Sequence, residues 1–476
     1  MGQEVAAGQT HSAATAAAPS RGERAGRWGV WHARLSRHTG WGLVAAGLAT
    51  AALCLSHLPS LLLHAQFYAD DGGWFQTAYE HGPLLTLWTP AAGYLVTLQR
   101  VTASLSLLLP TALVPTFFNA VALLVEAGGV CYLLSRRMAE SIPRLWVRLA
   151  VALVVIALPN AYDTTGNLTN AQWHLALIAF LVIFASPPRR LWGWICDGFV
   201  LVLSGLTGPY CILLEPIAAW RWLRDRGDRR RRFVLLANSA CALVQLGVLA
   251  AAFGQQRSSR GLAAGVAPLI TLLGRQITLG LLVGAHGLNG LVGRPFGDSL
   301  LALGVLAAIP ITTCAWAAWR GPAILRAFCL FAALELLLAL VAPSIPSPRW
   351  PNLGNPADIV NFHPGGIRYF LYPLLAFALS LGWRGGRRGR PGWRPAGDPP
   401  RREPRLRDAP ARVGAVAVLA LLLVTAADGV PRDWVYPPYL DQHWGAQVQR
   451  LDAAAPGTRV VIPINHQGWT ITLTAR

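Results

Sequence analysis

The sequence predicts an all-α polytopic membrane protein with about 11 transmembrane helices and a small outer tail that contains β-structure. Composition is the first observation behind this prediction. Hydrophobic residues make up 54% of the 476 residues and charged residues only 13%, about half of the charged share of a soluble globular protein. The second observation is that long apolar runs recur along the chain, since about 20 such residues suffice to cross a bilayer.

The basic residues indicate sidedness rather than a nucleic-acid partner. All 41 are Arg, which is typical of a GC-rich bacterial genome, and they give a net charge of +19. They gather in short blocks between apolar runs, the longest at 21–37, 221–232 and 384–412. Such blocks mark cytoplasmic loops facing anionic lipid. The seven Cys lie in apolar runs without a CxxC spacing, so neither a disulfide framework nor a zinc site is expected.

The Arg blocks divide the chain into three regions. Residues 1–40 predict a disordered basic cytoplasmic tail, 41–427 a transmembrane domain, and 428–476 an extracytoplasmic carboxyl-terminal tail. The protein is thus expected in the cell membrane, multi-pass, with its amino terminus in the cytoplasm and its carboxyl terminus outside. Spans that keep every Arg block on one side are predicted near 41–63, 113–134, 144–160, 170–186, 190–206, 208–222, 233–253, 298–319, 324–343, 367–383 and 412–427.

Two segments test this topology. The apolar run 267–285 would invert the sidedness of the later Arg block if it crossed, so we expect a re-entrant or surface-lying segment. Residues 191–220 must hold two spans within about 45 Å of helix, less than two crossings of a ~30 Å core. The turn 204–209 is then expected below the outer surface, where it requires either a protein cover or a wet cavity. We predict a cavity open to the outer face.

Potential chemistry concentrates in the outer loops, predicted at 64–112, 160–170, 254–297 and 343–367, whereas the cytoplasmic loop 384–412 is simply basic. The most specific signal is the adjacent pair Asp70 and Asp71. Mutual repulsion raises the pKa of one carboxyl towards that of a general base. The pair also suits a divalent metal such as Mg²⁺ or Mn²⁺, and Asp-Gly is common in plain solvated turns.

The stretch Tyr68-Ala69-Asp70-Asp71, a many-helix body, short paired helices and an outer carboxyl-terminal piece together resemble the GT-C membrane glycosyltransferases. The resemblance implies transfer of a sugar from a polyprenyl-phosphate carrier to a glycan, lipid or protein acceptor of the cell envelope at the outer face. It implies a catalytic acid at Asp70 or Asp71 only. Tyr68 is then expected beside the substrate.

Inverting sugar transfer also needs positive charge at the departing phosphate. The stretch from His363 to Arg368 is a candidate, because its glycines let backbone N–H groups approach an anion and Arg368 begins a helix. Arg349 is a second candidate for this role. The plain alternative is an ordinary turn with Arg368 reaching towards lipid headgroups.

A sugar-binding rim is predicted in the second outer loop. Asn167, Asn170 and His174 offer polar groups to sugar hydroxyls, and Trp173 offers a stacking face. Asn170 is equally well placed to cap the following helix. Among the intramembrane acids, Glu215 is expected to pair with Arg221 or Arg224.

The tail predicts two strands, Arg459–Ile464 and Trp469–Leu473, joined by a turn at 465–468. About 50 residues bury little core alone, so the tail is expected to dock on the membrane domain. Two other functions fit the same sequence. A transporter or flippase of lipid-linked sugar would show inverted repeats, whereas a polymerase or ligase of envelope polysaccharide would depend on outer Arg and His.

Overall fold

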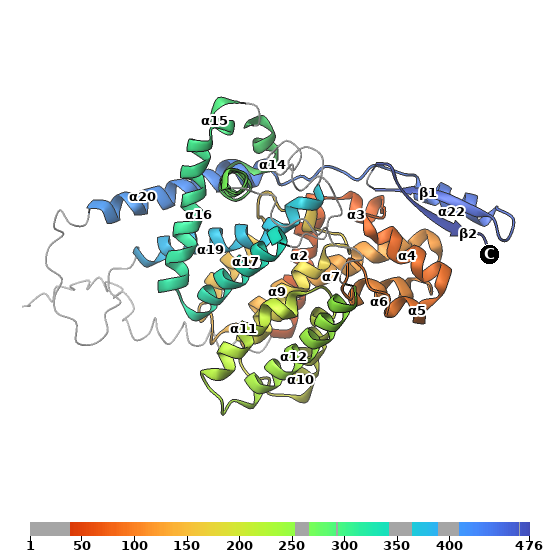
Figure 1. Ribbon diagram of the computed structural model, residues 1–476, viewed down its shortest axis with the longest axis horizontal. Coiled ribbons are helices and arrows are strands. Elements are labelled where there is room, and N and C mark those ends of the chain that lie inside the picture. Colours follow the sequence, from red (N-terminus) through yellow and green to blue (C-terminus); the bar gives the residue numbers. More distant parts are fainter. Residues whose placement is uncertain (1–38, 253–265, 292–293, 342–363, 389–408, 466) are drawn as a thin grey trace, which may run out of the picture. The chain divides into compact units, whose positions relative to one another are not determined.

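The computed structural model describes residues 39–252, 266–291, 294–341, 364–388, 409–465 and 467–476. The chain divides into two compact units, Met1–Ala45 and Ala46–Arg476, and the packing and the site both lie within the second. Helices dominate the described part, together with one sheet of two strands (Figure 1). The predicted disordered tail, 1–40, lies almost wholly outside the described residues.

Within the described residues, five helical segments are long and apolar enough to cross a membrane. They are Gly40–His57, Thr111–Leu134, Arg229–Ala251, Leu269–Leu288 and Leu300–Arg320. These segments belong to α2 (Thr39–His57), α7 (Val114–Leu134), α12 (Arg229–Ala251), α13 and α14, and α16 (Leu300–Arg320). They support a membrane protein.

The remaining predicted spans are also helical, and most of these helices are shorter than 18 residues. They are α8 (Leu145–Ile156), α9 (Ala171–Phe184), α10 (Leu191–Gly205), α11 (Tyr210–Leu223), α17 (Ala323–Val341), α19 (Leu371–Arg388) and α20 (Ala409–Val424). The number of about 11 crossings therefore stays a prediction.

The segment expected to be re-entrant contains one of these five candidate spans, Leu269–Leu288, so its re-entrant course stays a prediction. Its helix is broken. It consists of α13 (Val266–Leu272), a π-helical stretch at Leu273–Leu279 and α14 (Gly280–Leu291). Gly284 interrupts α14 with φ 68° and ψ 178°. Asp433 from the carboxyl-terminal tail accepts hydrogen bonds from the Ala285 amide at 2.7 Å and the His286 amide at 3.2 Å. The break is thus satisfied by a side chain from outside the helix.

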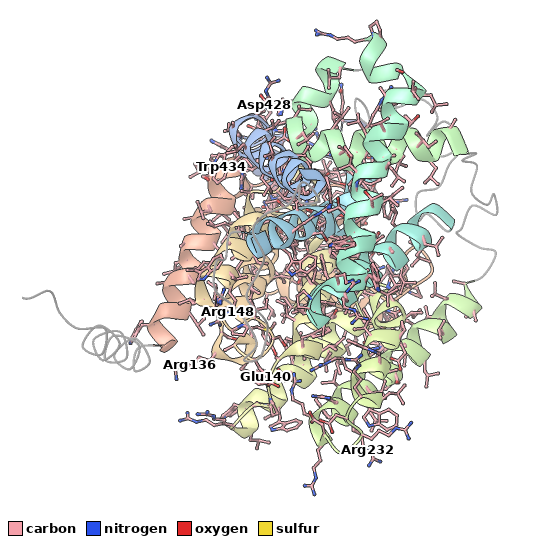
Figure 2. The ribbon with its side chains drawn as sticks, turned by 90° about the vertical axis from the view of Figure 1, so that its left-hand side faces the viewer. Arg136, Glu140, Arg148, Arg232, Asp428 and Trp434 are labelled. Carbon is pink, nitrogen blue, oxygen red and sulfur yellow. The ribbon has the colours of Figure 1, made fainter. Side chains whose placement is uncertain are left out.

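In the second unit the labelled arginines lie apart from the labelled residues of the tail, and Glu140 lies on the arginine side (Figure 2). Figure 2 shows Arg136, Arg148 and Arg232 towards one end and Asp428 and Trp434 towards the other. The first three belong to predicted cytoplasmic blocks and the last two to the predicted outer tail. This separation is the arrangement that the positive-inside rule requires. The direction of the chain relative to the two sides of a membrane stays a prediction.

Two acids within the predicted spans have different partners. Asp197 is fully buried and pairs with Arg137 at 2.5 Å and with Arg230 at 3.2 Å. Glu215 instead accepts hydrogen bonds from Asn238 and Ser239 of α12. The expected pairing of Glu215 with Arg221 or Arg224 is therefore wrong, because α11 turns this carboxylate towards α12.

The turn between α10 and α11 is covered by protein. The Thr97 amide donates to Leu206 O at 3.0 Å, and the Gly208 amide donates to Leu95 O at 2.9 Å. The hydroxyl of Thr207 accepts from the Leu98 amide at 3.0 Å. Protein from the first outer loop, rather than the predicted open cavity, satisfies this irregular backbone.

The first outer loop folds into α3 (Ser60–Leu63), α4 (Asp70–His81), α5 (Pro83–Leu87) and α6 (Thr97–Ser106). The tail adds α21 (Val430–Arg432), α22 (Trp444–Asp452), β1 (Arg459–Ile464) and β2 (Trp469–Thr474). The two strands pair antiparallel, with Arg459 opposite Thr474 and Ile464 opposite Trp469. The predicted strands are confirmed, and β2 packs against α4 (Figure 1).

An apolar cluster joins the tail to the loop. Val460, Ile462, Ile471 and Leu473 share one buried core with Phe75 of α4. The strands alternate buried and exposed positions, as half-buried strands do. The tail therefore docks on the rest of the second unit as predicted.

Candidate functional site

The acid pair begins a helix rather than lying in a solvated turn. Asp70 and Asp71 form the first turn of α4, directly after Ala69, whose φ of 47° and ψ of −120° are unusual for a residue with a Cβ. The Ala69 amide donates to Asn465 O of the tail at 2.7 Å. Such backbone strain persists only where surrounding contacts enforce it, and here the docked tail supplies one.

The next residue, Gly72, explains why the pair is followed by glycine. A Cβ at this position would lie 2.7 Å from Ile464 Cδ1 and 2.9 Å from Ile471 Cγ2. The sheet thus approaches α4 more closely than any other residue permits. Close packing, not a turn, accounts for the Asp-Gly dipeptide.

Asp71 is completely buried against the second outer loop. Its Oδ1 accepts from the Thr169 hydroxyl at 2.7 Å, and its Oδ2 accepts from the Leu168 amide at 3.3 Å. Burial raises the pKa of Asp71 to about 7; the hydrogen bonds from Thr169 and Leu168 oppose this shift, and the Asp70 charge adds a smaller contribution. The expected raised pKa is present, but desolvation is its main cause.

Asp70, by contrast, is solvent-exposed. Desolvation by the surrounding protein raises its pKa, while the positive charge of Arg368 lowers it. The adjacent acids therefore occupy different environments. One carboxyl is held inside by hydrogen bonds, and the other is accessible beside a cation.

A third acid, Asp163, joins this site from the short 3₁₀ turn Tyr162–Thr164. Its Oδ1 accepts from the Tyr68 hydroxyl at 2.5 Å and from Asn170 Nδ2 at 3.3 Å, and its Oδ2 accepts from the Arg368 amide at 3.4 Å. Burial raises the pKa of Asp163 to about 6, against the lowering effects of the Arg368 charge and the Tyr68 hydrogen bond. Asp163 thus links the three chain segments that carry Tyr68, Asn170 and Arg368.

Sequence reasoning did not single out Asp163 or the tail residue Tyr439. The ring of Tyr439 stacks on Tyr68 with centroids 5.1 Å apart. The only signal for Asp163 was its position among the amides of the second outer loop, and nothing local marks Tyr439, because 371 residues separate it from Tyr68.

The predicted sugar-binding rim is tightly structured. Asn167 donates to Asp163 O at 2.8 Å and accepts from the Asn170 amide at 2.9 Å. Asn170 stands at the start of α9, yet its side chain makes no cap hydrogen bond and donates instead to Asp163 O at 2.8 Å. The simple capping interpretation is therefore wrong. His174 lies within hydrogen-bonding distance of Thr164 O at 2.9 Å.

Trp173 does not present an open face. Its indole is 2% exposed and contacts the rings of Tyr210, Tyr369 and Tyr372 at centroid distances of 5.2 to 5.5 Å. The predicted sugar-stacking platform is thus occupied by tyrosines of this chain. The Trp173 ring packs between helices because α9 is buried on almost every side.

Several polar atoms of this loop have no hydrogen-bond partner among the described residues. They are Asn160 Oδ1, Asn170 Oδ1, Gln172 Oε1 and Trp173 Nε1. Buried polar groups are nearly always satisfied by protein, water or ligand. All four atoms are enclosed by the surrounding protein, so they stabilise no ligand on an open surface.

On the predicted phosphate side, only Arg368 is described. It lies in a 3₁₀ segment, Pro364–Phe370, just before α19, and its guanidinium lies 5.3 Å from the centre of the Tyr369 ring. His363 and Arg349 lie outside the described residues. The structure thus brings Arg368, Asp70 and Asp163 into one charged group.

A dedicated metal cage is not formed by this part of the chain. Within the described residues, no group of three or more His, Cys, Asp or Glu side chains is arranged to hold a metal ion. Asp71 already accepts two hydrogen bonds inside the protein, so Asp70 alone faces outwards. Mg²⁺ is usually held by one or two carboxylates together with water and phosphate oxygens, so the metal role of the acid pair stays a prediction.

Comparison of the chain with protein-family models, with curated proteins and with solved structures gives no match. The fold and the site define a helical protein with candidate membrane spans, in which the loops at 64–112 and 160–170 and the 3₁₀ segment Pro364–Phe370 converge on three carboxyls and one guanidinium.

Proposed function

We propose that this protein is a membrane glycosyltransferase that moves a sugar from a polyprenyl-phosphate carrier to a cell-envelope acceptor at the outer face. The observation that carries the proposal is the division of the acid pair. Asp70 is exposed beside the Arg368 charge, while Asp71 is buried and hydrogen-bonded. An accessible base next to a cation is what inverting transfer from a phosphate requires.

Asp70 is the general base in this proposal. The acceptor hydroxyl gives its proton to the Asp70 carboxylate as its oxygen attacks the anomeric carbon. The bond from that carbon to the phosphate oxygen breaks, and the electron pair leaves with the phosphate. Desolvation strengthens Asp70 as a base by raising its pKa, whereas the Arg368 charge keeps it ionised.

Asp71 has a positioning role. Its hydrogen bonds to Thr169 and Leu168 tie α4 to the second outer loop. With both oxygens facing the protein, it cannot reach an acceptor hydroxyl without losing these bonds. Its adjacency to Asp70 thereby fixes the direction of the base.

Arg368 supplies positive charge to the departing phosphate, and its amide is held by Asp163. The strain at Ala69 supports the same location, because strained backbone is concentrated at functional sites.

The test is sugar transfer by Asp70→Asn protein, using a panel of hexosyl and pentosyl polyprenyl phosphates as donors. We expect kcat to fall by ~10²–10⁴-fold, the usual contribution of a general base. Thermal stability should stay unchanged, since the side chain is exposed. Asp452→Asn removes an exposed carboxylate from α22 and serves as the matched control.

Two outcomes contradict the proposal. Undiminished transfer by Asp70→Asn protein would remove the base. Movement of the lipid-linked sugar across the membrane of a vesicle, without transfer to an acceptor, would instead favour a transporter or flippase.

A further inference from the structure

Two helices of the first predicted outer loop expose leucines and bury polar side chains, although α6 also buries Leu98 and Ala103. On α5, Thr86 is fully buried, while Leu84 and Leu85 are 75% and 71% exposed. On α6, Gln99 and Arg100 are buried. A helix that faces water has the opposite pattern.

Specific contacts hold the polar groups inside. Arg100 Nε donates to Thr89 O at 3.2 Å, and Nη1 donates to the Thr86 hydroxyl at 3.3 Å. The guanidinium also lies 4.8 Å from the centre of the Trp74 ring on α4. The reversed polarity is therefore built into the packing of α4, α5 and α6.

The outward apolar residues, named the leucine patch, are Leu84, Leu85, Trp88, Leu105, Leu108 and Leu113. Leu108 is 82% exposed and Leu113 is 52% exposed. The candidate span Thr111–Leu134 follows the patch directly in the chain, and α6 packs against α7.

The sequence around the patch contains almost no charge. Between His81 and Glu126 the one charged residue is Arg100, and it is buried. A water-facing loop of this length normally carries several charges, because about a quarter of residues in soluble domains are charged. The surroundings of α5 and α6 are therefore apolar.

We propose that the leucine patch inserts into the hydrocarbon core of the lipid bilayer. It would lie in the leaflet nearest the start of the Thr111–Leu134 span. The bilayer is the occupant because the patch directly precedes that span in the chain and lacks charged residues. Trp88, at the end of α5, suits the boundary between hydrocarbon and headgroups. Since α4 packs against both helices, insertion fixes the acid-bearing helix relative to the bilayer.

The test is spin-label accessibility in nanodiscs of phosphatidylethanolamine and phosphatidylglycerol. Single cysteines replace Leu85, Trp88 or Leu108 in full-length protein carrying Cys196→Ser, which removes an exposed native thiol. Ala446→Cys on α22 is the exposed control. Collision with oxygen, which concentrates in hydrocarbon, is compared with collision with a water-soluble nickel chelate.

We expect the three patch labels to favour oxygen over the chelate by several-fold relative to the α22 control. Chelate access equal to that of the control would show that the patch faces water and would overturn the proposal. Low access to both reagents would also overturn it, because another protein surface would then cover the patch. If one substitution prevents folding, Leu84→Cys replaces it at an equally exposed position.

Discussion

Asp71→Asn removes a carboxyl group whose pKa burial raises from 3.8 to about 7. A group with a raised folded-state pKa stabilises the folded protein below its unfolded pKa, and that contribution is lost as the pH rises through the folded value. For Asp71 the loss extends from about pH 4 to about pH 7. The free energy of unfolding of wild-type protein should therefore fall as the pH rises across this window. The free energy of unfolding of Asp71→Asn protein should fall less.

The magnitude follows from the size of the shift. A rise of about 3 units corresponds to about 4 kcal/mol of unfolding free energy in total. About 2 to 3 kcal/mol of this falls between pH 5 and pH 8. Loss of one hydrogen bond to Thr169 or Leu168 destabilises the variant by about 1 kcal/mol at every pH. The pH dependence, rather than stability at a single pH, is therefore the informative quantity.

The assay is thermal unfolding in detergent micelles, followed by tryptophan fluorescence at pH 5 and pH 8. The melting temperature of wild-type protein should fall between these values by clearly more than that of Asp71→Asn protein. The Asp452→Asn variant, which loses an exposed carboxylate on the tail helix, should behave like wild type. An identical fall in wild type and Asp71→Asn would refute the argument that burial controls this carboxyl.

Two further substitutions test the packing. Gly284→Ala should destabilise the docked tail by about 1–3 kcal/mol, since the new Cβ would lie 2.4 Å from Asp433 Cγ at a positive φ. Faster proteolysis of the tail is the readout, and Gly290→Ala, with open space around it, should be neutral; equal proteolysis of both variants would contradict the role of Asp433. Asp197→Asn should cost about 3–5 kcal/mol in denaturant unfolding because it leaves buried cations unpaired, whereas Asp225→Asn, at a half-exposed pair, should cost less than about 1 kcal/mol. Equal losses would show that burial of the ion pair is unimportant.

Local pattern was sufficient for the helices and the tail strands. Apolar runs near 113–134 and 298–319 became α7 and α16 almost residue for residue, because hydropathy and length act within one segment. The apolar stretch Arg459–Ile464, followed by a turn, similarly predicted β1. These features depend on neighbours in the chain and are therefore readable from it.

The environment of each acid required the tertiary structure. Adjacent carboxyls are equivalent by sequence, yet the rotation of α4 against the second outer loop buries Asp71 and exposes Asp70. Glu215 likewise faces Asn238 and Ser239 rather than the nearby arginines. The periodicity of a helix determines which positions share a face. The neighbouring segments of the folded chain determine which groups that face contacts.

The sequence by itself determined that this chain is helical, membrane-associated and polar in its outer loops, since composition and periodicity fix how much surface each segment must hide from water. Only the tertiary structure decided that Asp163, Tyr439 and Arg368 join the acid pair, and that α5 and α6 turn their leucines outwards. Those arrangements arise from contacts between residues far apart in the chain. A local sequence pattern does not contain the free energies of such contacts.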